Sequence, residues 1–373
     1  MQEEMTSEQL AEAKTYQRQQ LLCDLADRAL DVTYLAVMAF AVAPWLDMQL
    51  RGISWLDQNW WLRLAVLFLI VIGGHIVVSF PLSLYAGHVL EHRFKLSRQS
   101  LARWLGRYAK RNLLAVAFGL AMVQGLYWLV WFTGPYWWLA AAGSFFLVSI
   151  VLGQLAPVLI MPLFYKIERL EDEDLSERFA RLSKGTGLSI EGIYRMEMSA
   201  ETVKANAMLA GLGRTRRVIL GDTLLDSFTH EEIEVILAHE IGHHVHRHIP
   251  KLMLTGLIYS TASFFLCDRL LSVWIAGDVP YRPLPVYVLP LLMLAITLFS
   301  QLLEPLQNSI SRHFERQSDR FALQHTHLVD AYRSAFSKLA KLNKADPNPH
   351  PLEVFLFDSH PPIAERLAMA DRV

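Results

Sequence analysis

Long apolar runs alternate with polar segments along this chain. Each run approaches the roughly 20 residues that a helix needs to cross a bilayer, although the first run is shorter. The pattern predicts six membrane-spanning helices: Val32–Leu46, Leu64–Ala86, Leu113–Phe132, Trp137–Leu159, Leu252–Ala276 and Leu284–Leu303. It divides the chain into an exposed polar helix, a four-span region, a polar block, a two-span region and a polar tail, which are residues 1–28, 29–164, 165–250, 251–304 and 305–373.

Basic residues are unevenly distributed among the connections between these spans. The three connections on one side carry only Arg51, Arg63 and Arg282. On the other side, the connection 88–112 carries Arg93, Lys95, Arg98, Arg103, Arg107, Lys110 and Arg111. Because cytoplasmic loops are enriched in Lys and Arg, we expect residues 88–112 to be cytoplasmic. Counting spans then assigns the N-terminus, residues 165–250 and residues 305–373 to the cytoplasm too.

Composition supports a membrane protein with a polar part. Hydrophobic residues make up 53% of the chain and its mean hydropathy is +0.25, which is too apolar for an ordinary soluble protein. The net charge of −1 gives no sign of nucleic-acid binding, and two cysteines make no disulfide framework. The polar N-terminal segment shows no cleavable signal peptide, so we expect a multi-pass protein of a bacterial inner membrane or the endoplasmic reticulum.

A few polar residues interrupt the predicted spans, namely His75, Gln154, Asp268 and Arg269. Ionisable groups at membrane depth usually face a bundle interior or a water-filled cavity. Two interpretations stay open. Either these residues line a cavity, or His75 is hydrogen-bonded in a packed core and the Asp268–Arg269 pair lies near a membrane edge.

The polar block contains the motif His239-Glu240-Ile241-Gly242-His243. Two histidines four residues apart lie on one face of a helix and can bind one Zn²⁺, while the neighbouring glutamate reaches a metal-bound water. Thr229 and Glu232 form a capping box that starts this helix, and Pro250 indicates a break beyond its end. By itself the motif arises by chance in roughly a few per cent of chains this rich in histidine.

A helix expected after the last span supplies the remaining candidate ligand. Glu315 would complete a His₂Glu site, leaving the fourth position for water. Asp319, one turn later, could accept the free ring N–H of a ligating histidine. The alternative for these acidic residues is a salt-bridged surface face. His244 and His248 are also four residues apart, but we interpret them, with His246, as a solvated or interfacial cluster.

Two further segments are candidates for substrate contact. Residues 203–209, a turn at 211–215 and residues 217–222 have a β-hairpin pattern directly before the motif helix. An edge strand there could pair with an extended substrate, through Asn206 and Ala207. In the tail, His360 and Arg366 could stabilise an oxyanion, although a histidine between prolines is more often structural.

Six segments in order resemble the integral-membrane zinc metallopeptidases of the CAAX prenyl protease type 1 group. They are Glu91–Ser100, Pro162–Phe164, Asn206–Leu224, His239–His243, Ser311–Asp319 and His360–Pro362. Two positions depart from the family pattern: Lys204-Ala205 stands in place of His-Ser, and Ser318 in place of Ala. The resemblance implies a helical membrane barrel around an aqueous chamber, with a cytoplasmic α/β zinc peptidase domain. It also implies peptide substrates that carry a prenyl group in some members.

The sequence therefore predicts a membrane zinc endopeptidase. His239, His243 and Glu315 would hold one Zn²⁺, and Glu240 would take a proton from the attacking water and pass it to the leaving amine. A quality-control protease of misfolded membrane proteins is the alternative within the same class. An inactive metal-binding scaffold is disfavoured because Glu240 and Glu315 are both present, and a transporter would not explain the ordered motifs.

Overall fold

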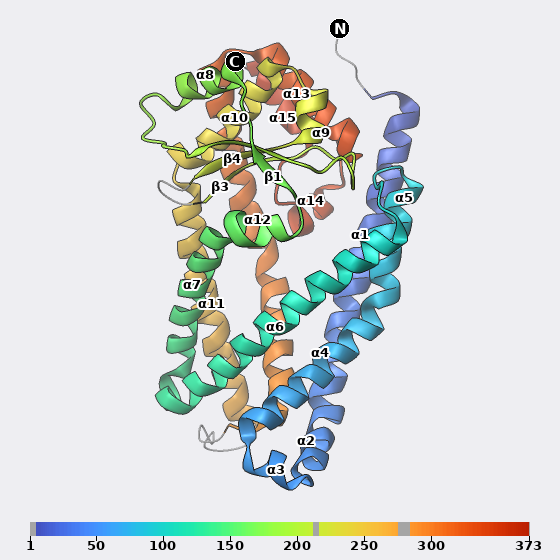
Figure 1. Ribbon diagram of the computed structural model, residues 1–373, viewed down its shortest axis with the longest axis vertical. Coiled ribbons are helices and arrows are strands. Elements are labelled where there is room, and N and C mark those ends of the chain that lie inside the picture. Colours follow the sequence, from blue (N-terminus) through green and yellow to red (C-terminus); the bar gives the residue numbers. More distant parts are fainter. Residues whose placement is uncertain (1–4, 212–215, 275–283, 373) are drawn as a thin grey trace.

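The computed structural model describes residues 5–211, 216–274 and 284–372. The molecule is elongated, with long helices at one end and a small sheet among shorter helices at the other (Figure 1). Three features of the sequence predictions lie outside the described residues. These are the hairpin turn beyond Gly211, Arg282, and the last two residues of the fifth predicted span.

Helices make up the long end of the molecule. Several of them run on through π-helical turns. They are α1 (Ser7–Val37), η1 (Met38–Val42), α2 (Ala43–Arg51), α3 (Ser54–Gln58), α4 (Trp60–Leu84), η2 (Tyr85–Leu90), α5 (Glu91–Arg93), α6 (Leu101–Thr133), η3 (Gly134–Tyr136), α7 (Trp137–Leu155), η4 (Ala156–Ile160), η5 (Met161–Leu163), α11 (His248–Trp274), η7 (Val286–Val288) and α12 (Leu289–Thr326).

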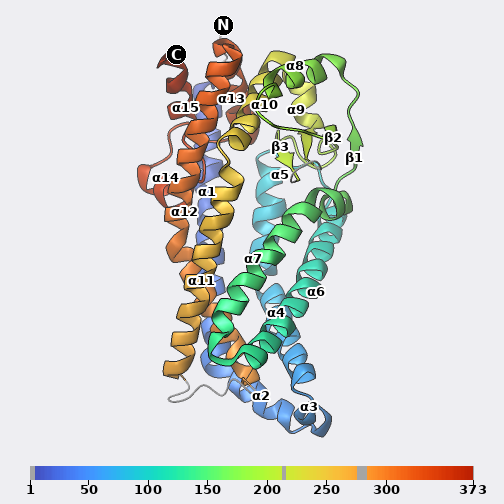
Figure 2. The same cartoon turned by 90° about the vertical axis from the view of Figure 1, so that its left-hand side faces the viewer.

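Within the described residues, five helical segments are long and apolar enough to cross a membrane. Each of the six predicted spans overlaps one of them, because the 63-residue segment Leu101–Leu163 holds two. In that segment α6 and α7 turn back on each other at η3 (Figure 2). The turn uses Gly134 at a φ of 52°, a conformation open to glycine. The helical, multi-pass class predicted from the apolar pattern is confirmed.

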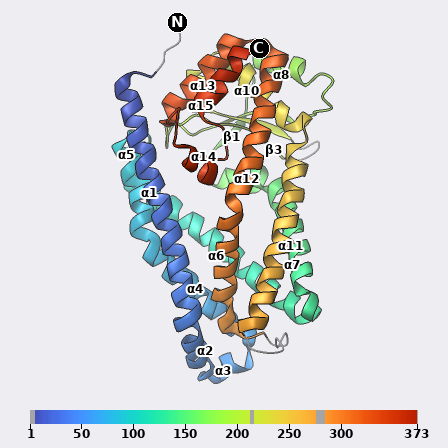
Figure 3. The ribbon, with the colours of Figure 1, turned by 180° about the vertical axis from the view of Figure 1, so that it is seen from behind.

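The polar N-terminal helix is not a separate, exposed element. α1 runs without a break from its polar half into the first apolar run (Figure 3). The Tyr16 ring is buried and packs 5.2 Å from the Phe94 ring. Gln17 accepts a hydrogen bond of 2.8 Å from the backbone N–H of Asp346. The expectation of an exposed helix is therefore wrong for the face that carries Tyr16, because that face packs against segments distant in sequence.

The other end of the molecule holds a four-stranded sheet in the order β1-β2-β4-β3. β2 and β4 are parallel, while β1 pairs with β2 and β3 with β4 in antiparallel fashion. The predicted hairpin is confirmed, since Leu209 lies opposite Val218, and β3 forms an edge of the sheet. The strands are β1 (Ile167–Arg169), β2 (Gly192–Met196), β3 (Ala207–Ala210) and β4 (Arg217–Gly221).

One apolar core joins the sheet to the helices around it. Val218 and Leu220 of β4 pack with Ile233 and Leu237 on the motif helix α10. The helices at this end are α8 (Glu173–Ser183), α9 (Asp222–Ser227), α10 (His230–Val245), α13 (Val329–Asn343), α14 (Pro351–Phe357), α15 (Ile363–Met369) and η8 (Ala370–Arg372). β4 packs against α10 and β3 pairs with β4, so the sheet holds β3 beside α10. That this end of the molecule lies in the cytoplasm stays a prediction.

α12 is the element that joins the two ends. Its 38 residues begin in the last apolar run and continue to the region of α10 and α15, so the predicted boundary at residue 304 falls inside one helix. α10 and α12 approach each other very closely at Gly242. A Cβ atom at this position would lie 2.9 Å from the Cα of Ser318, so only glycine allows this spacing.

The polar residues in the predicted spans have different surroundings. The indole N–H of Trp137 donates a hydrogen bond of 2.8 Å to Asp268, whose side chain is buried and also pairs with Arg269. His75 lies 2.7 Å from an Asp31 oxygen. Gln154 is exposed. Asp268 is thus a buried group partnered by Trp137 and Arg269, and His75 is hydrogen-bonded.

Candidate active site

The motif helix begins as the sequence predicts. The Thr229 hydroxyl accepts the N–H of Glu232, and the Glu232 carboxylate accepts the N–H of Thr229. The helix ends at Val245, and Arg247 turns the chain with a φ of 55°. Pro250 lies in the first turn of α11, where its missing N–H costs little.

Three side chains from two helices converge at the proposed metal site. The Nε2 atoms of His239 and His243 lie 3.2 Å apart. Glu315 on α12 has one oxygen 3.2 Å from His239 Nε2 and the other 3.3 Å from His243 Nε2. In the described part of the chain, these three residues form the group of His, Cys, Asp and Glu side chains suited to hold a metal ion. The predicted ligand set is thus brought together by α10 and α12.

The spacing and chemistry of these atoms fit a metal ion. Four ligands at the roughly 2.0–2.1 Å typical of zinc stand about 3.3–3.4 Å apart in a tetrahedron, close to the three distances observed. The Glu315 Oε2 atom is buried without a hydrogen-bond donor. A cation among the three side chains would satisfy this oxygen and both imidazole lone pairs, which otherwise face one another.

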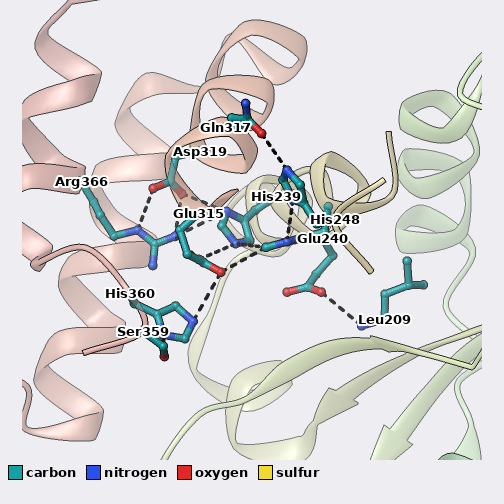
Figure 4. Close-up of polar contacts among 11 residues, drawn as sticks. Leu209, His239, Glu240, His248, Glu315, Gln317, Asp319, Ser359, His360 and Arg366 are labelled. Atoms are coloured by element: carbon teal, nitrogen blue, oxygen red, sulfur yellow. Dashed lines mark hydrogen bonds and ion pairs between the residues drawn. The ribbon is translucent and has the colours of Figure 1, made fainter. Parts of the chain in front are cut away.

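Asp319 and Arg366 lie behind His239 and fix its ring (Figure 4). The Nδ1–H of His239 donates to Asp319 over 2.9 Å, which leaves Nε2 free as a ligand. Arg366 donates twice to the same carboxylate, at 2.9 and 2.6 Å. Burial lowers the pKa of the His239 imidazole, but the carboxylates of Asp319 and Glu315 beside the ring outweigh burial and raise that pKa to about 9.

His243 is held by a second, different arrangement. Its Nδ1 lies 3.0 Å from Nδ1 of His248, and Nε2 of His248 lies 2.8 Å from the side-chain oxygen of Gln317. Because that amide oxygen can only accept, His248 carries its proton on Nε2 and accepts the Nδ1–H of His243. This tautomer leaves His243 Nε2 free to bind a metal. His248 is fully buried, so the solvated alternative for this residue is wrong.

Glu240 lies between the candidate metal site and the edge of the sheet. The backbone carbonyl of Asn206 accepts a hydrogen bond from the N–H of Gly221 on β4. Because backbone groups alternate in direction along an antiparallel strand, the N–H and C=O groups of Ala207 and Leu209 point away from β4, to the free edge of β3. The N–H of Leu209 donates to a Glu240 oxygen over 3.2 Å. The catalytic candidate thus contacts an edge strand that has backbone groups available for an extended peptide.

A cavity of about 560 Å³ opens beside these residues. Its lining includes His239, Glu240 and Glu315 together with Asn206 and Ala207. His360 also lines it, with Nε2 3.6 Å from a Glu315 oxygen and with 62% of its side chain exposed. Most of the predicted site residues therefore line one open cavity. Arg366 also lines it, but its side chain is buried and contacts Asp319.

Comparison with known proteins identifies the architecture. A sequence model described as peptidase family M48 matches residues 169–373, which is more than half of the chain. The chain belongs to this family. A second model, described as the CAAX prenyl protease N-terminal region with five membrane helices, matches residues 1–166 of this chain. The protein is therefore a membrane metallopeptidase, and its family implies a metal cofactor.

Relatives and a solved structure match most of this M48 peptidase. CAAX prenyl protease 1 of Saccharomyces cerevisiae is 30% identical over 80% of this chain and 69% of its own. The CAAX prenyl protease 1 homolog of Arabidopsis thaliana is 28% identical over 90% and 81%, respectively. The crystal structure of S. mikatae Ste24p superposes with a TM-score of 0.84 over 98% of this chain and 89% of that one, at 24% identity, and so shows a shared fold.

Two features of the M48 peptidase site were not foreseen. His248 is hydrogen-bonded to the candidate ligand His243. In the sequence, it is only a histidine five residues after a candidate ligand, and that spacing does not predict where its ring points. The orientation of Arg366 toward Asp319 favours a positioning role over the expected role at an oxyanion. Ser318 is the residue that Gly242 faces.

Proposed function

We propose that this M48 peptidase is a zinc endopeptidase that cleaves peptides lying along the free edge of β3. The convergence of His239, His243 and Glu315 at 3.2–3.3 Å is the observation that carries the proposal. Two nitrogens and a carboxylate at this spacing suit Zn²⁺, and they leave a position for a water or substrate.

Each residue of the site has a role that follows from its position. A bound zinc ion would polarise the scissile carbonyl and lower the pKa of a water molecule. Glu240 accepts the proton of the attacking water and delivers it to the nitrogen of the leaving amine. Backbone groups of Ala207 and Leu209 pair with the substrate, and Asn206 contributes a side chain at the entrance of this edge. When a peptide binds, the Leu209 N–H exchanges its contact with Glu240 for a substrate carbonyl.

The tail supplies two further groups with different roles. His360 is exposed to the cavity close to Glu315, so its ring can donate to a substrate oxyanion. Arg366 acts through Asp319, whose carboxylate it holds against His239.

We extend the proposal to C-terminal peptides, including prenylated ones. The support is the name CAAX prenyl protease 1 that the similar yeast and plant proteins carry, with family matches along nearly the whole chain. The basic connection at 88–112 supports a cytoplasmic active site in a bacterial inner membrane or the endoplasmic reticulum. Its backbone pairs with the segment before β3, since the Arg98 N–H donates to the carbonyl of Glu201 over 2.8 Å.

One experiment tests the chemistry and the substrate together. Zinc-loaded full-length protein in detergent is given a reporter peptide with or without a C-terminal farnesyl-cysteine group, beside the variant Glu240→Gln. We expect the variant to retain zinc, because Glu240 is not a ligand, and to lose measurable cleavage. Bound zinc is measured by elemental analysis, and the expected substrate result is faster cleavage of the farnesylated peptide.

The outcomes separate the alternatives. Full cleavage by Glu240→Gln would contradict the proposed chemistry. If wild type cleaves both peptides equally and Glu240→Gln cleaves neither, the zinc mechanism is supported. The substrate range would then be broader than prenylated peptides, as in a quality-control protease. Cleavage of neither peptide by the zinc-loaded protein would favour the inactive scaffold.

A further inference from the structure

A separate cavity lies where the long helices meet the end that carries the sheet. It has a volume of about 480 Å³ and lies between η2, the first turns of α6 and the segment before β3. α6 begins beside α5, close to that end of the molecule (Figure 1). The lining combines aromatic side chains, such as Trp104 and Tyr108, with Arg107 and Arg111. This cavity shares no described lining residue with the one at the metal ligands.

The cavity lies at the depth where the predicted spans change from apolar to charged. Residues 101–112 of α6 contain four basic residues, whereas residues 113–165 contain no Asp, Glu, Lys or Arg. Residues 64–90, on the neighbouring α4 and η2, also lack these residues, and the first that follows is Glu91. Arg111 and Glu91 both line the cavity. It therefore lies where these spans leave the hydrocarbon, at the level of lipid headgroups.

The basic residues around this cavity have contacts but are mostly not neutralised. Arg103 and Lys110 donate hydrogen bonds to backbone carbonyls, over 3.4 and 2.9 Å. The Arg111 guanidinium lies 5.5 Å from the centroid of the Tyr108 ring. Among the described residues, no carboxylate is found within ion-pair distance of these three basic side chains. A carbonyl satisfies a donor but leaves the full positive charge in place.

The two carboxylates in the lining do not supply the missing negative charge. Glu201 forms an ion pair with Arg107. Glu91 forms one with Lys204, at 3.0 Å. Because each of these pairs is neutral as a whole, the charge left in the lining is that of Arg111. The cavity therefore favours an anion over a cation.

Apolar surface continues from the cavity along the two helices that form it. The Phe80 ring of α4 packs edge-on against the Tyr108 ring, with 5.5 Å between centroids. Farther from the sheet, Val77 on α4 is 72% exposed and Leu113 on α6 is 70% exposed. An anion that also carries acyl chains would contact both the charged cavity and these apolar helices, whereas a soluble anion would use the cavity alone.

We propose that this cavity binds the phosphate headgroup of an anionic phospholipid, with Arg111 as the main charged contact. The lipid thereby neutralises a cation that no described carboxylate neutralises. A basic side chain near the membrane surface strengthens the binding of anionic lipid about fivefold. The site is independent of the zinc chemistry, because neither its residues nor its ligand reaches the metal site.

Lipid titrations followed by native mass spectrometry test the site. Zinc-loaded full-length protein in detergent is titrated with short-chain phosphatidylglycerol or with the matching phosphatidylcholine. We expect one saturable phosphatidylglycerol, bound at least about fivefold more tightly than phosphatidylcholine. Arg111→Gln should weaken phosphatidylglycerol binding about fivefold, and Arg111→Lys should retain most of it because the charge is kept. Arg111 is exposed, so both variants should fold, and thermal unfolding in the same detergent checks this.

Lys251→Gln is the matched control. Lys251 is also an exposed basic residue at the start of a predicted span, in the first turn of α11, but it does not line the cavity. Its removal lowers the net charge by the same amount as Arg111→Gln. The affinity for phosphatidylglycerol should stay unchanged in this control.

Three outcomes would overturn the proposal. Equal affinities of wild type for the two lipids would show that the cavity does not select an anion. Equal losses in Arg111→Gln and Lys251→Gln would show a general attraction to positive charge rather than a site. Binding of soluble glycerol 3-phosphate as tightly as phosphatidylglycerol would replace the lipid by a free phosphate compound. Since no cleavage is measured, each result can be judged separately from the proposed endopeptidase.

Discussion

The metal-binding end and the membrane end of this protein are packed in opposite ways. On α10, ten of 16 residues are buried, whereas on α7 only three of 19 are. At the metal end, Gly242 lets α10 approach the backbone of α12, since a Cβ atom there would lie 2.9 Å from the Cα of Ser318. On the membrane side, large apolar residues such as Leu147 and Leu254 are exposed, as expected for helices that contact lipid.

The difference reflects what each end must hold constant. Ligand atoms must stay within a few tenths of an ångström of their positions for a metal to bind, and the close packing of α10 against α12 restricts their movement. The membrane helices need only stay apolar and satisfy their backbone hydrogen bonds. Substitutions at the two ends should therefore affect different measured quantities.

The largest effect is expected from Gly242→Leu. The new side chain would push α10 away from Ser318 and separate Glu315 from the two histidines, so zinc binding and cleavage should be lost. Overpacking should also lower the free energy of unfolding by about 1–3 kcal/mol. Zinc content and thermal unfolding measure both effects, with Gly143→Leu as the control. Normal zinc content in Gly242→Leu would show that the close approach is not needed for the site.

A smaller effect is expected from His248→Ala, which removes the acceptor for the Nδ1–H of His243. Loss of such an outer partner typically weakens metal binding or activity about 10–100-fold. Competition with a zinc chelator measures the affinity. His244→Ala is the matched control, since no hydrogen bond between His244 and the ligands is found in the described chain. Equal zinc affinities for the two variants would contradict the role assigned to His248.

The smallest effect on catalysis is expected at the membrane end. Trp137→Phe removes the hydrogen bond to buried Asp268 and should destabilise the protein by about 1–3 kcal/mol. Zinc affinity and kcat/KM of the folded fraction should stay unchanged, because this pair contacts none of the ligands. Thermal unfolding in detergent, with Trp138→Phe as the control, measures the loss. A change in zinc affinity would mean that the two ends are coupled.

The sequence predicted the candidate active-site residues more completely than the contacts between distant segments. A helical period places His239 and His243 on one face, so the structure of one helix was enough to pair them. Glu315 and Asp319 were candidates from their positions on a helix expected after the last span, and the order of several motifs that resemble a known family favoured Glu315 as a ligand over a surface ion pair. The β3–β4 hairpin followed from local turn and strand patterns, and the apolar runs located the spans.

Features that depend on distant contacts were not predictable in the same way. Whether Tyr16 is exposed depends on Phe94, and no local pattern reports that contact. The direction of the His248 ring depends on the turn at Arg247 and on Gln317 from another helix. The sequence made Arg366 a candidate site residue that could stabilise an oxyanion. Its hydrogen bonds to Asp319, which only the structure shows, favour a role in positioning that carboxylate instead.

The contact between Arg366 and Asp319 has a consequence for the timing of enzyme maturation. Arg366 lies on α15, which is synthesised after α12 and after every predicted span. Until α15 is made and docks, the buried Asp319 carboxylate lacks the two hydrogen bonds that Arg366 donates. The arrangement of the site described here therefore needs a segment that is synthesised after every predicted span.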